Sequence, residues 1–124
     1  MNDKKHTILC VDDDPDVLEY LRAVLEAEGY NFIRADTAEA GLKTYKQSNP
    51  DIVIADLMME SVDAGTQFVK DLKLEGNTAP VFMLSSVGDD LSRQIDPSAI
   101  GLAGVFQKPV NKERLLKIIS NKLA

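Results

Sequence analysis

Short runs of apolar residues recur along the chain, and segments with helical spacing separate most of them. The runs are Ile8 to Val11, Phe32 to Ile33, Ile52 to Ala55, Val81 to Leu84 and Val105 to Phe106. Strands that alternate with helices favour a parallel sheet, in which helices cover both faces and each strand reads as a continuous apolar run. The pattern therefore predicts an α/β fold.

Four of the segments outside these runs have the spacing of amphipathic helices. The first begins at Asp14-Pro15, a capping residue followed by a first-turn proline, and Gly29 marks its end. Asp36 or Thr37 can cap the second helix. The apolar positions expected to face the core are Leu18, Leu21 and Leu25; Ala38, Leu42 and Tyr45; Phe68, Val69 and Leu72; and Leu115, Ile118, Ile119 and Leu123.

The segment before the last helix is harder to assign. Leu91 and Ile95 suggest a helix after two aspartates, but Pro97 must end or kink it early. The sequence contains no internal repeat, linker or low-complexity tract, and 124 residues suit one domain. We expect a single (βα)₅ unit with no output domain fused to it.

Composition narrows the class of protein further. The one cysteine, Cys10, lies in an apolar run and is expected to be a buried thiol in a reducing compartment. The N-terminal segment is too polar for a signal peptide or a membrane span, so we expect a cytoplasmic protein with no membrane contact. A net charge of −6 and a pI near 4.7 argue against direct nucleic-acid binding.

Polar residues follow four of the apolar runs. They are Asp12, Asp13 and Asp14 after the first run, Asp56 after the third, Ser85 and Ser86 after the fourth, and Gln107 and Lys108 after the fifth. In open parallel sheets, functional groups collect outside the carboxyl ends of the strands. If the strand order is 2-1-3-4-5, the carboxylates of Asp12, Asp13 and Asp56 and the hydroxyl of Ser85 share one shallow pocket, which Lys108 closes.

At this point the sequence resembles the response-regulator receiver family. The matching segments are VDDDP after the first strand, VIADLMM around Asp56, MLSS after the fourth strand and QKP after the fifth. The resemblance spans residues 7–124 as the receiver domain and leaves residues 1–6 as a short polar tail. It implies a doubly wound, flavodoxin-like (βα)₅ fold whose five parallel strands have the order 2-1-3-4-5, with helices on both faces.

The physical chemistry of the pocket agrees with this resemblance. Three carboxylates within several ångströms repel one another by a few kcal/mol per pair, so a hard divalent cation is expected among them. Mg²⁺ suits oxygen ligands and keeps water ligands. Asp13 and Asp56 should bind it directly and Asp12 through water, and the resemblance adds the backbone carbonyl of Met58.

The resemblance also implies a function. Asp56 accepts a phosphoryl group from the phosphohistidine of a sensor histidine kinase or a histidine phosphotransfer protein, and Ser85 and Lys108 contact the phosphoryl oxygens. The modified domain then contacts a downstream target protein. The protein is expected to be a monomer or weak homodimer that catalyses only its own phosphorylation and dephosphorylation.

Three positions depart from the family pattern. Glu60 stands where a proline is usual, and Gly65 lies one residue late, so the intervening loop is one residue longer. Val105 replaces the usual aromatic residue, and strand alternation turns the adjacent Phe106 to the opposite face. The family's aromatic switch therefore cannot be transferred to this chain. The resemblance further implies a cis peptide bond between Lys108 and Pro109.

The same residues allow other interpretations. Asp14 is expected to cap a helix, and His6 to be a tail residue. The segment Ile8 to Asp14 also matches a haloacid-dehalogenase-like phosphatase, with Asp12 as nucleophile and Asp14 as acid; steady turnover lost in Asp12→Asn would identify it. A docking module that is never phosphorylated and a flavodoxin-like flavin carrier are further alternatives, the second disfavoured by the acidic first loop.

Overall fold

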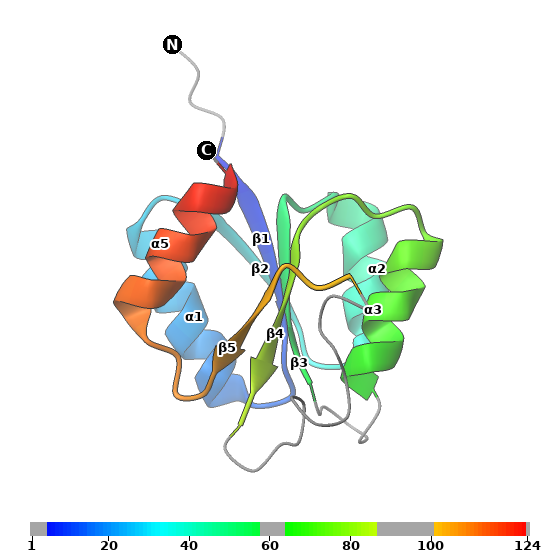
Figure 1. Cartoon of the computed structure of the whole chain (residues 1–124), viewed down its shortest axis with the longest axis horizontal. Coiled ribbons are helices and arrows are strands. Elements are labelled where there is room, and N and C mark those ends of the chain that lie inside the picture. Colours follow the sequence, from blue (N-terminus) through cyan, green and yellow to red (C-terminus); the bar gives the residue numbers. More distant parts are fainter. Residues whose placement is uncertain (1–4, 58–63, 87–100, 124) are drawn as a thin grey trace.

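Backbone hydrogen bonds join five short strands into one parallel sheet in the computed structural model (Figure 1). The structure describes residues 5–57, 64–86 and 101–123. The strands are β1 (Thr7–Val11), β2 (Asn31–Ala35), β3 (Ile52–Asp56), β4 (Val81–Ser85) and β5 (Gly104–Gln107). Their order is β2-β1-β3-β4-β5, and each neighbouring pair is parallel. The expected strand order is therefore confirmed.

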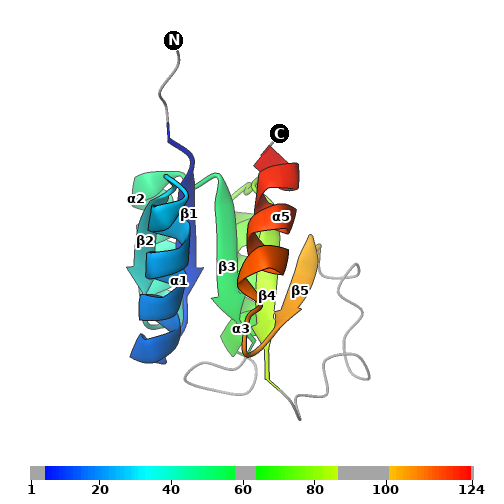
Figure 2. The ribbon, with the colours of Figure 1, turned by 90° about the vertical axis from the view of Figure 1, so that its left-hand side faces the viewer.

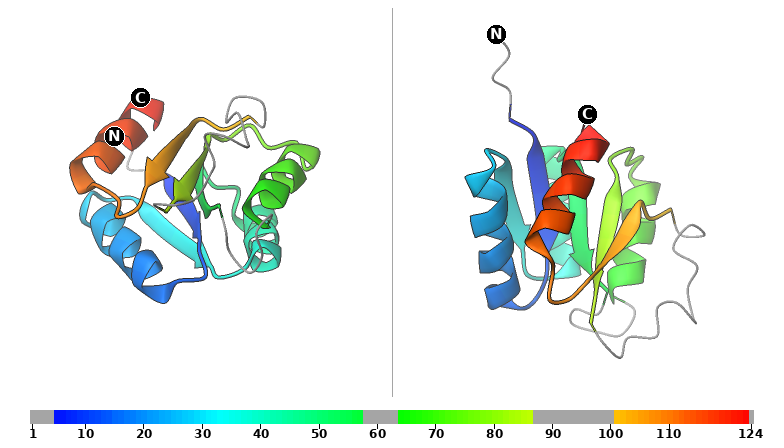
Figure 3. Two further views of the ribbon diagram at one scale, coloured as in Figure 1. Left: turned by 60° about the horizontal axis from the view of Figure 1, so that its bottom comes forward. Right: turned by 60° about the vertical axis from the view of Figure 1, so that its left-hand side comes forward.

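Helices cover both faces of this sheet, as predicted. The helices within the described residues are α1 (Pro15–Ala27), α2 (Ala38–Ser48), α3 (Ala64–Leu74) and α5 (Lys112–Leu123). Helices α1 and α5 pack on one face, and α2 and α3 pack on the other (Figures 1 and 2). Figure 3 shows β2 and β5 at the two edges of the sheet.

Alternation along the strands divides the apolar side chains between two cores. In β1, Leu9 and Val11 belong to the core beneath α2 and α3, whereas Ile8 and Cys10 belong to the core beneath α1 and α5. Every residue of β3 and β4 is buried, because both strands lie inside the sheet and helices cover both faces. The continuous apolar runs of the sequence are explained by this double coverage.

The edge strand β5 shows the same alternation. Phe106 is buried in the core beneath α1 and α5, where its ring lies 5.2 Å from the ring of Phe82. Val105 packs at the margin of the opposite core. The prediction that these two side chains point to opposite faces is confirmed.

The predicted helix ends are largely confirmed. The side chain of Asp14 accepts a hydrogen bond from the Asp16 backbone N–H and caps α1. Of the two residues that could cap α2, Thr37 does so, because its hydroxyl accepts from the Ala40 N–H at 3.0 Å. Asn111 caps α5 by accepting from the Arg114 N–H at 2.8 Å.

Some expectations fall on residues that the structure does not describe. They include the shortened helix around Leu91, Ile95 and Pro97, the loop that contains Glu60, and most of the N-terminal tail. His6 is described: its carbonyl accepts from the Asn31 N–H, and its ring lies 3.8 Å from the Asp51 carboxylate. Within the described ranges, no helix combines the length and the apolar character needed to cross a bilayer.

Candidate functional site

The polar residues singled out in the sequence meet at the carboxyl edge of the sheet. Asp12 and Asp13 directly follow β1, Asp56 ends β3, Ser85 ends β4, and Lys108 directly follows β5. Because β1, β3, β4 and β5 are adjacent and parallel, all of these strand ends lie at the same edge. The fold therefore gathers at one place residues that are far apart in the sequence.

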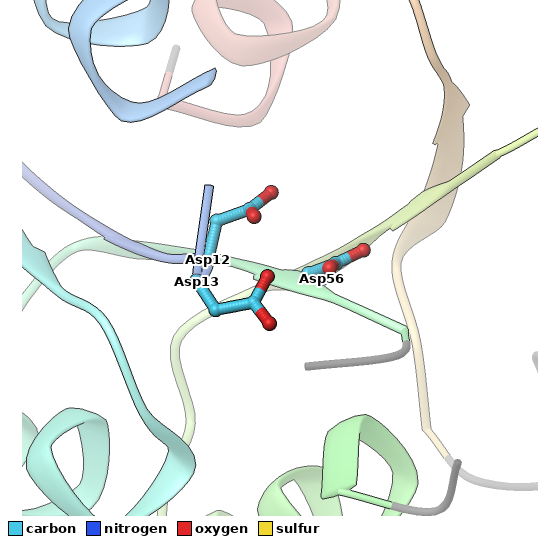
Figure 4. A group of neighbouring side chains, drawn as sticks. All are labelled: Asp12, Asp13 and Asp56. Atoms are coloured by element: carbon cyan, nitrogen blue, oxygen red, sulfur yellow. The ribbon is translucent and has the colours of Figure 1, made fainter. Parts of the chain in front are cut away.

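The three carboxyl groups lie close together (Figure 4). One carboxylate oxygen from each of Asp12, Asp13 and Asp56 lies within 4.8 Å of the others. Asp12 is fully buried and Asp56 is 5% exposed, whereas Asp13 is exposed. The cluster is thus buried at Asp12 and Asp56 and open to solvent at Asp13.

This donor set fits a hard divalent cation. Carboxylate oxygens are the ligands that Mg²⁺ and Ca²⁺ prefer, and an exposed carboxylate leaves room for water ligands. Both oxygens of Asp12 already have partners: Oδ1 accepts from the Asp14 N–H at 2.9 Å, and Oδ2 lies 3.0 Å from Lys108 Nζ. Asp13 and Asp56 are therefore the better placed carboxylates for direct contact with an ion.

Lys108 provides the positive charge of the site. Its ammonium lies 3.0 Å from Asp12 Oδ2 and 3.3 Å from Asp56 Oδ1, and its side chain is 19% exposed. The backbone N–H of Lys108 donates to the Ser85 carbonyl at 2.7 Å, and the Lys108–Pro109 peptide bond is cis, as the resemblance implied. Within the described part of the chain, this one ammonium contacts two of the three clustered carboxylates.

Ionisation of these groups is perturbed by their surroundings. Burial, together with the Asp12 carboxylate, raises the pKa of Asp56 from 3.8 to about 6, although Lys108 acts in the opposite direction. Partial burial lowers the pKa of Lys108, but the hydrogen bonds and charges of Asp12 and Asp56 outweigh it and raise that pKa overall. A strongly perturbed acid beside a specific charged partner is typical of functional sites.

Ser85 places a hydroxyl at the same edge. The residue is 8% exposed, and its Oγ lies 3.5 Å from the Ser86 carbonyl oxygen, a distance at the outer limit of a hydrogen bond. In the ladder between β4 and β5 it stands opposite Gln107, one residue before Lys108. Within the described residues the hydroxyl has only this weak partner, and the chain that carries Lys108 runs alongside it.

Gly65 has a role that the sequence pattern did not reveal. Its N–H donates to the Leu57 carbonyl at 3.1 Å, and a Cβ atom at this position would overlap the carbonyl oxygens of Asp56 and Leu57. The first turn of α3 thus rests directly on the chain that leaves Asp56. The sequence marked this glycine only by its displaced spacing; the steric need for it depends on how α3 packs.

The remaining site predictions lie outside the described residues. They are the backbone carbonyl of Met58 as a metal ligand and the influence of Glu60 on its loop. Asp14, which the phosphatase alternative required as an acid, caps α1 instead.

Comparison with known protein families gives one match over most of the chain. Residues 8–120 match the model of the response regulator receiver domain. Protein PilH of Pseudomonas aeruginosa is 30% identical over 118 residues, which cover 94% of this chain and 97% of PilH. The transcriptional regulatory protein GlrR of Escherichia coli is 31% identical over 123 residues, but the chain spans only 27% of its length.

Solved structures show the same architecture. A putative response regulator from Chloroflexus aurantiacus superposes with a TM-score of 0.84 at 33% identity, covering 97% of this chain and 98% of that protein. The chemotaxis response regulator CheY4 of Vibrio cholerae superposes with a TM-score of 0.85 at 26% identity, covering 96% of this chain and 99% of CheY4.

Proposed function

Because the chain belongs to the response regulator receiver domain family, which acts in two-component signalling, we propose that it accepts a phosphoryl group on Asp56. The observation that carries the proposal is the position of the Asp56 carboxylate. At the carboxyl edge of the sheet it lies within 4.8 Å of the Asp12 and Asp13 carboxylates, and its Oδ1 lies 3.3 Å from the Lys108 ammonium. We assign the receiver domain to residues 7–124 and the preceding residues to a short tail.

The chemical step is an in-line transfer of a phosphoryl group. A carboxylate oxygen of Asp56 attacks the phosphorus of a phosphohistidine, the phosphorus–nitrogen bond breaks, and the imidazole leaves with the bonding electrons and takes up a proton. The product is an aspartyl phosphate. Lys108 faces the transferred oxygens with a positive charge, and Ser85 donates its weakly held hydroxyl hydrogen to them.

Lys108 must change partners during this reaction. Its ammonium holds Asp12 and Asp56 together before the transfer, and the phosphoryl oxygens compete for it afterwards. Because the cationic form of Lys108 is favoured in this site, the charge is present at neutral pH. Fixed charge at the point where negative charge accumulates is the main source of electrostatic catalysis.

Mg²⁺ is the proposed cofactor of the site. Asp13 and Asp56 would hold it directly, the Met58 carbonyl would add a ligand, and Asp12 would act through water, since both of its oxygens are already engaged. When bound, the ion neutralises the carboxylates and orients the phosphoryl oxygens.

The proposed partners follow from this chemistry. The phosphoryl donor is a sensor histidine kinase or a histidine phosphotransfer protein, and the phosphorylated form contacts a downstream target protein. We propose no direct contact with nucleic acid or membrane, and a monomer or weak homodimer. A cytoplasmic location is part of the proposal, because the single cysteine, Cys10, is buried and its pKa is raised by burial, as expected for an inert thiol.

Two observations favour this function over the phosphatase alternative. Asp12, the nucleophile that such a phosphatase needs, is fully buried and has both oxygens engaged. Asp14, its general acid, is occupied as the cap of α1. Asp56 is 5% exposed rather than fully buried, and its described ion pair with Lys108 involves only Oδ1.

Intact-mass analysis tests the proposal. Incubation with acetyl phosphate and Mg²⁺ should add one phosphoryl group to the parent protein and none to Asp56→Asn. Asp36→Asn is the matched control, because Asp36 is an exposed carboxylate just after β2 at the same edge of the sheet. Labelling of Asp56→Asn, or an unlabelled parent protein in donor excess, would refute the assignment. Continuous turnover abolished by Asp12→Asn would indicate the phosphatase.

A further inference from the structure

Tyr20 links helix α1 to the segment that carries Lys108. Its hydroxyl donates a hydrogen bond to the Val110 carbonyl at 3.0 Å, across 90 positions of sequence. Tyr20 is 41% exposed, one of two large apolar residues so exposed within the described ranges, whereas Val110 is 9% exposed and belongs to the core beneath α1 and α5. Core packing therefore does not explain this tyrosine by itself.

The backbone around Lys108 is held from two sides. Upstream, the Lys108 N–H donates to the Ser85 carbonyl at 2.7 Å. Downstream, Pro109 has no N–H to donate, and the next carbonyl with a described partner is that of Val110, which Tyr20 holds. The first of these hydrogen bonds comes from β4, which ends in Ser85. The second comes from α1, the helix that follows Asp12 and Asp13.

The position of this backbone matters because the Lys108 side chain is long and flexible. Its ammonium must face Asp12 at 3.0 Å and Asp56 at 3.3 Å, and small displacements of a charged group lower its effect on a reaction. Helix α1 is itself tied to the site, since the Asp14 N–H at its cap donates to Asp12 Oδ1. Tyr20 thus fixes the lysine segment relative to the aspartates.

We propose that Tyr20 is a positioning residue for Lys108 in phosphoryl transfer. This inference rests on the function proposed above. Tyr20 would act by fixing the position of the Lys108 backbone. Tyr20 does not contact the phosphoryl group.

The first test removes only the hydroxyl. Tyr20→Phe should lower the rate constant for labelling by acetyl phosphate by about three- to tenfold, the range that corresponds to one hydrogen bond. Tyr30→Phe is the matched control: Tyr30 packs in the same core, and its hydroxyl has no hydrogen bond with any described residue, so its rate should equal that of the parent. Rates are measured well below the melting temperature of every variant. Equal rates for Tyr20→Phe and the parent would overturn the inference.

The second test asks whether Tyr20 acts through Lys108. Tyr20→Phe is made in the parent and in a Lys108→Ala background, and labelling rates and beryllofluoride affinity in Mg²⁺ are compared among the four proteins. A positioning role predicts an effect in the parent and none without the Lys108 side chain. The same fold-change in both backgrounds would show a general structural effect and would overturn the inference. A parent protein that acetyl phosphate does not label would instead refute the proposed function.

Discussion

At the Asp56 side chain, burial and the neighbouring Asp12 carboxylate oppose ionisation. Its pKa of about 6 lies above the ordinary value of 3.8, so between about pH 4 and pH 6 the folded state binds more protons than the unfolded chain. The free energy of unfolding therefore falls as pH rises through this window and stays lower above it. Ionised Asp56 destabilises the metal-free fold at neutral pH.

The fall in the free energy of unfolding with rising pH gives a prediction for Asp56→Asn in the absence of divalent ions. The variant should be about as stable as the parent near pH 4 and more stable near pH 7.5, by up to roughly 3 kcal/mol if the full pKa difference is expressed. Urea denaturation in EDTA at the two pH values measures it. Asp36→Asn, which removes an exposed carboxylate at the same edge of the sheet, controls for the loss of one negative charge. A gain that is equal at both pH values would contradict the assigned cause.

Gly65 is the second residue with a testable role. Alanine in a helix is normally favoured over glycine by about 1 kcal/mol. Here the added methyl group would overlap the carbonyl oxygens of Asp56 and Leu57, so Gly65→Ala should destabilise the protein by about 1–3 kcal/mol and slow labelling of Asp56. The change in the free energy of unfolding, measured by urea titration, shows which effect is larger. A stabilised variant would contradict the prediction and show that α3 can shift at no cost.

At the level of whole elements, the start of α2 separates two residues that the sequence left equivalent. The Thr37 hydroxyl accepts from the Ala40 N–H, whereas the neighbouring Asp36 is exposed and makes no such capping bond within the described residues. Thr37→Ala should cost about 1 kcal/mol of unfolding free energy, and Asp36→Ala well under half of that. Denaturant midpoints of the two variants test the cap, and the reverse order would assign it to Asp36.

The sequence predicted those elements whose side chains repeat with a clear period. The run from Ile52 to Ala55 indicated a strand covered on both faces, and Val105 and Phe106 were assigned to opposite faces by alternation alone. The acidic cluster was also predicted, because parallel strands bring their carboxyl ends to one edge. The strand order itself came from family resemblance and not from periodicity.

Other features depend on contacts that no local pattern records. The hydrogen bond from Tyr20 joins positions 90 residues apart, and neither partner belongs to a motif. The need for glycine at position 65 arises only when α3 packs on the end of β3. The ion pair of Lys108 with Asp12 was likewise not foreseen, since the sequence placed Lys108 toward an incoming phosphoryl group.

At the scale of the whole molecule, an ion bound to the acidic cluster should stabilise the entire fold. A cation that binds only the folded state raises the free energy of unfolding by about 2.7 kcal/mol at one hundred times its Kd. We expect Mg²⁺ to raise the melting temperature of the parent. Asp13→Asn should weaken this response, because Asp13 is the exposed carboxylate of the cluster.

Calorimetry with and without Mg²⁺ measures both effects. Asp36→Asn controls for a general loss of negative charge and should respond to Mg²⁺ as the parent does. The protein carries a net charge of −6, so any salt can stabilise the fold by screening the repulsion between its negative charges. Replacing Mg²⁺ with Na⁺ at equal ionic strength measures this general effect. Equal responses to the two cations would argue against a specific site.

The double ion pair of Lys108 bears on how the chain is made. The ribosome synthesises Asp12 and Asp56 well before Lys108. Lys108 comes directly after β5, which is an edge strand of the sheet. A nascent chain that has paired β1 with β3 therefore holds two buried carboxylates without their shared counter-ion until β5 docks on β4. Docking of β5 brings the Lys108 ammonium to these carboxylates. The docking of β5 is therefore coupled electrostatically to the pairing of β1 with β3. Chains truncated before β5 should accordingly be marginally stable substrates for cellular proteases, and the chemistry of the site becomes available only to completed domains.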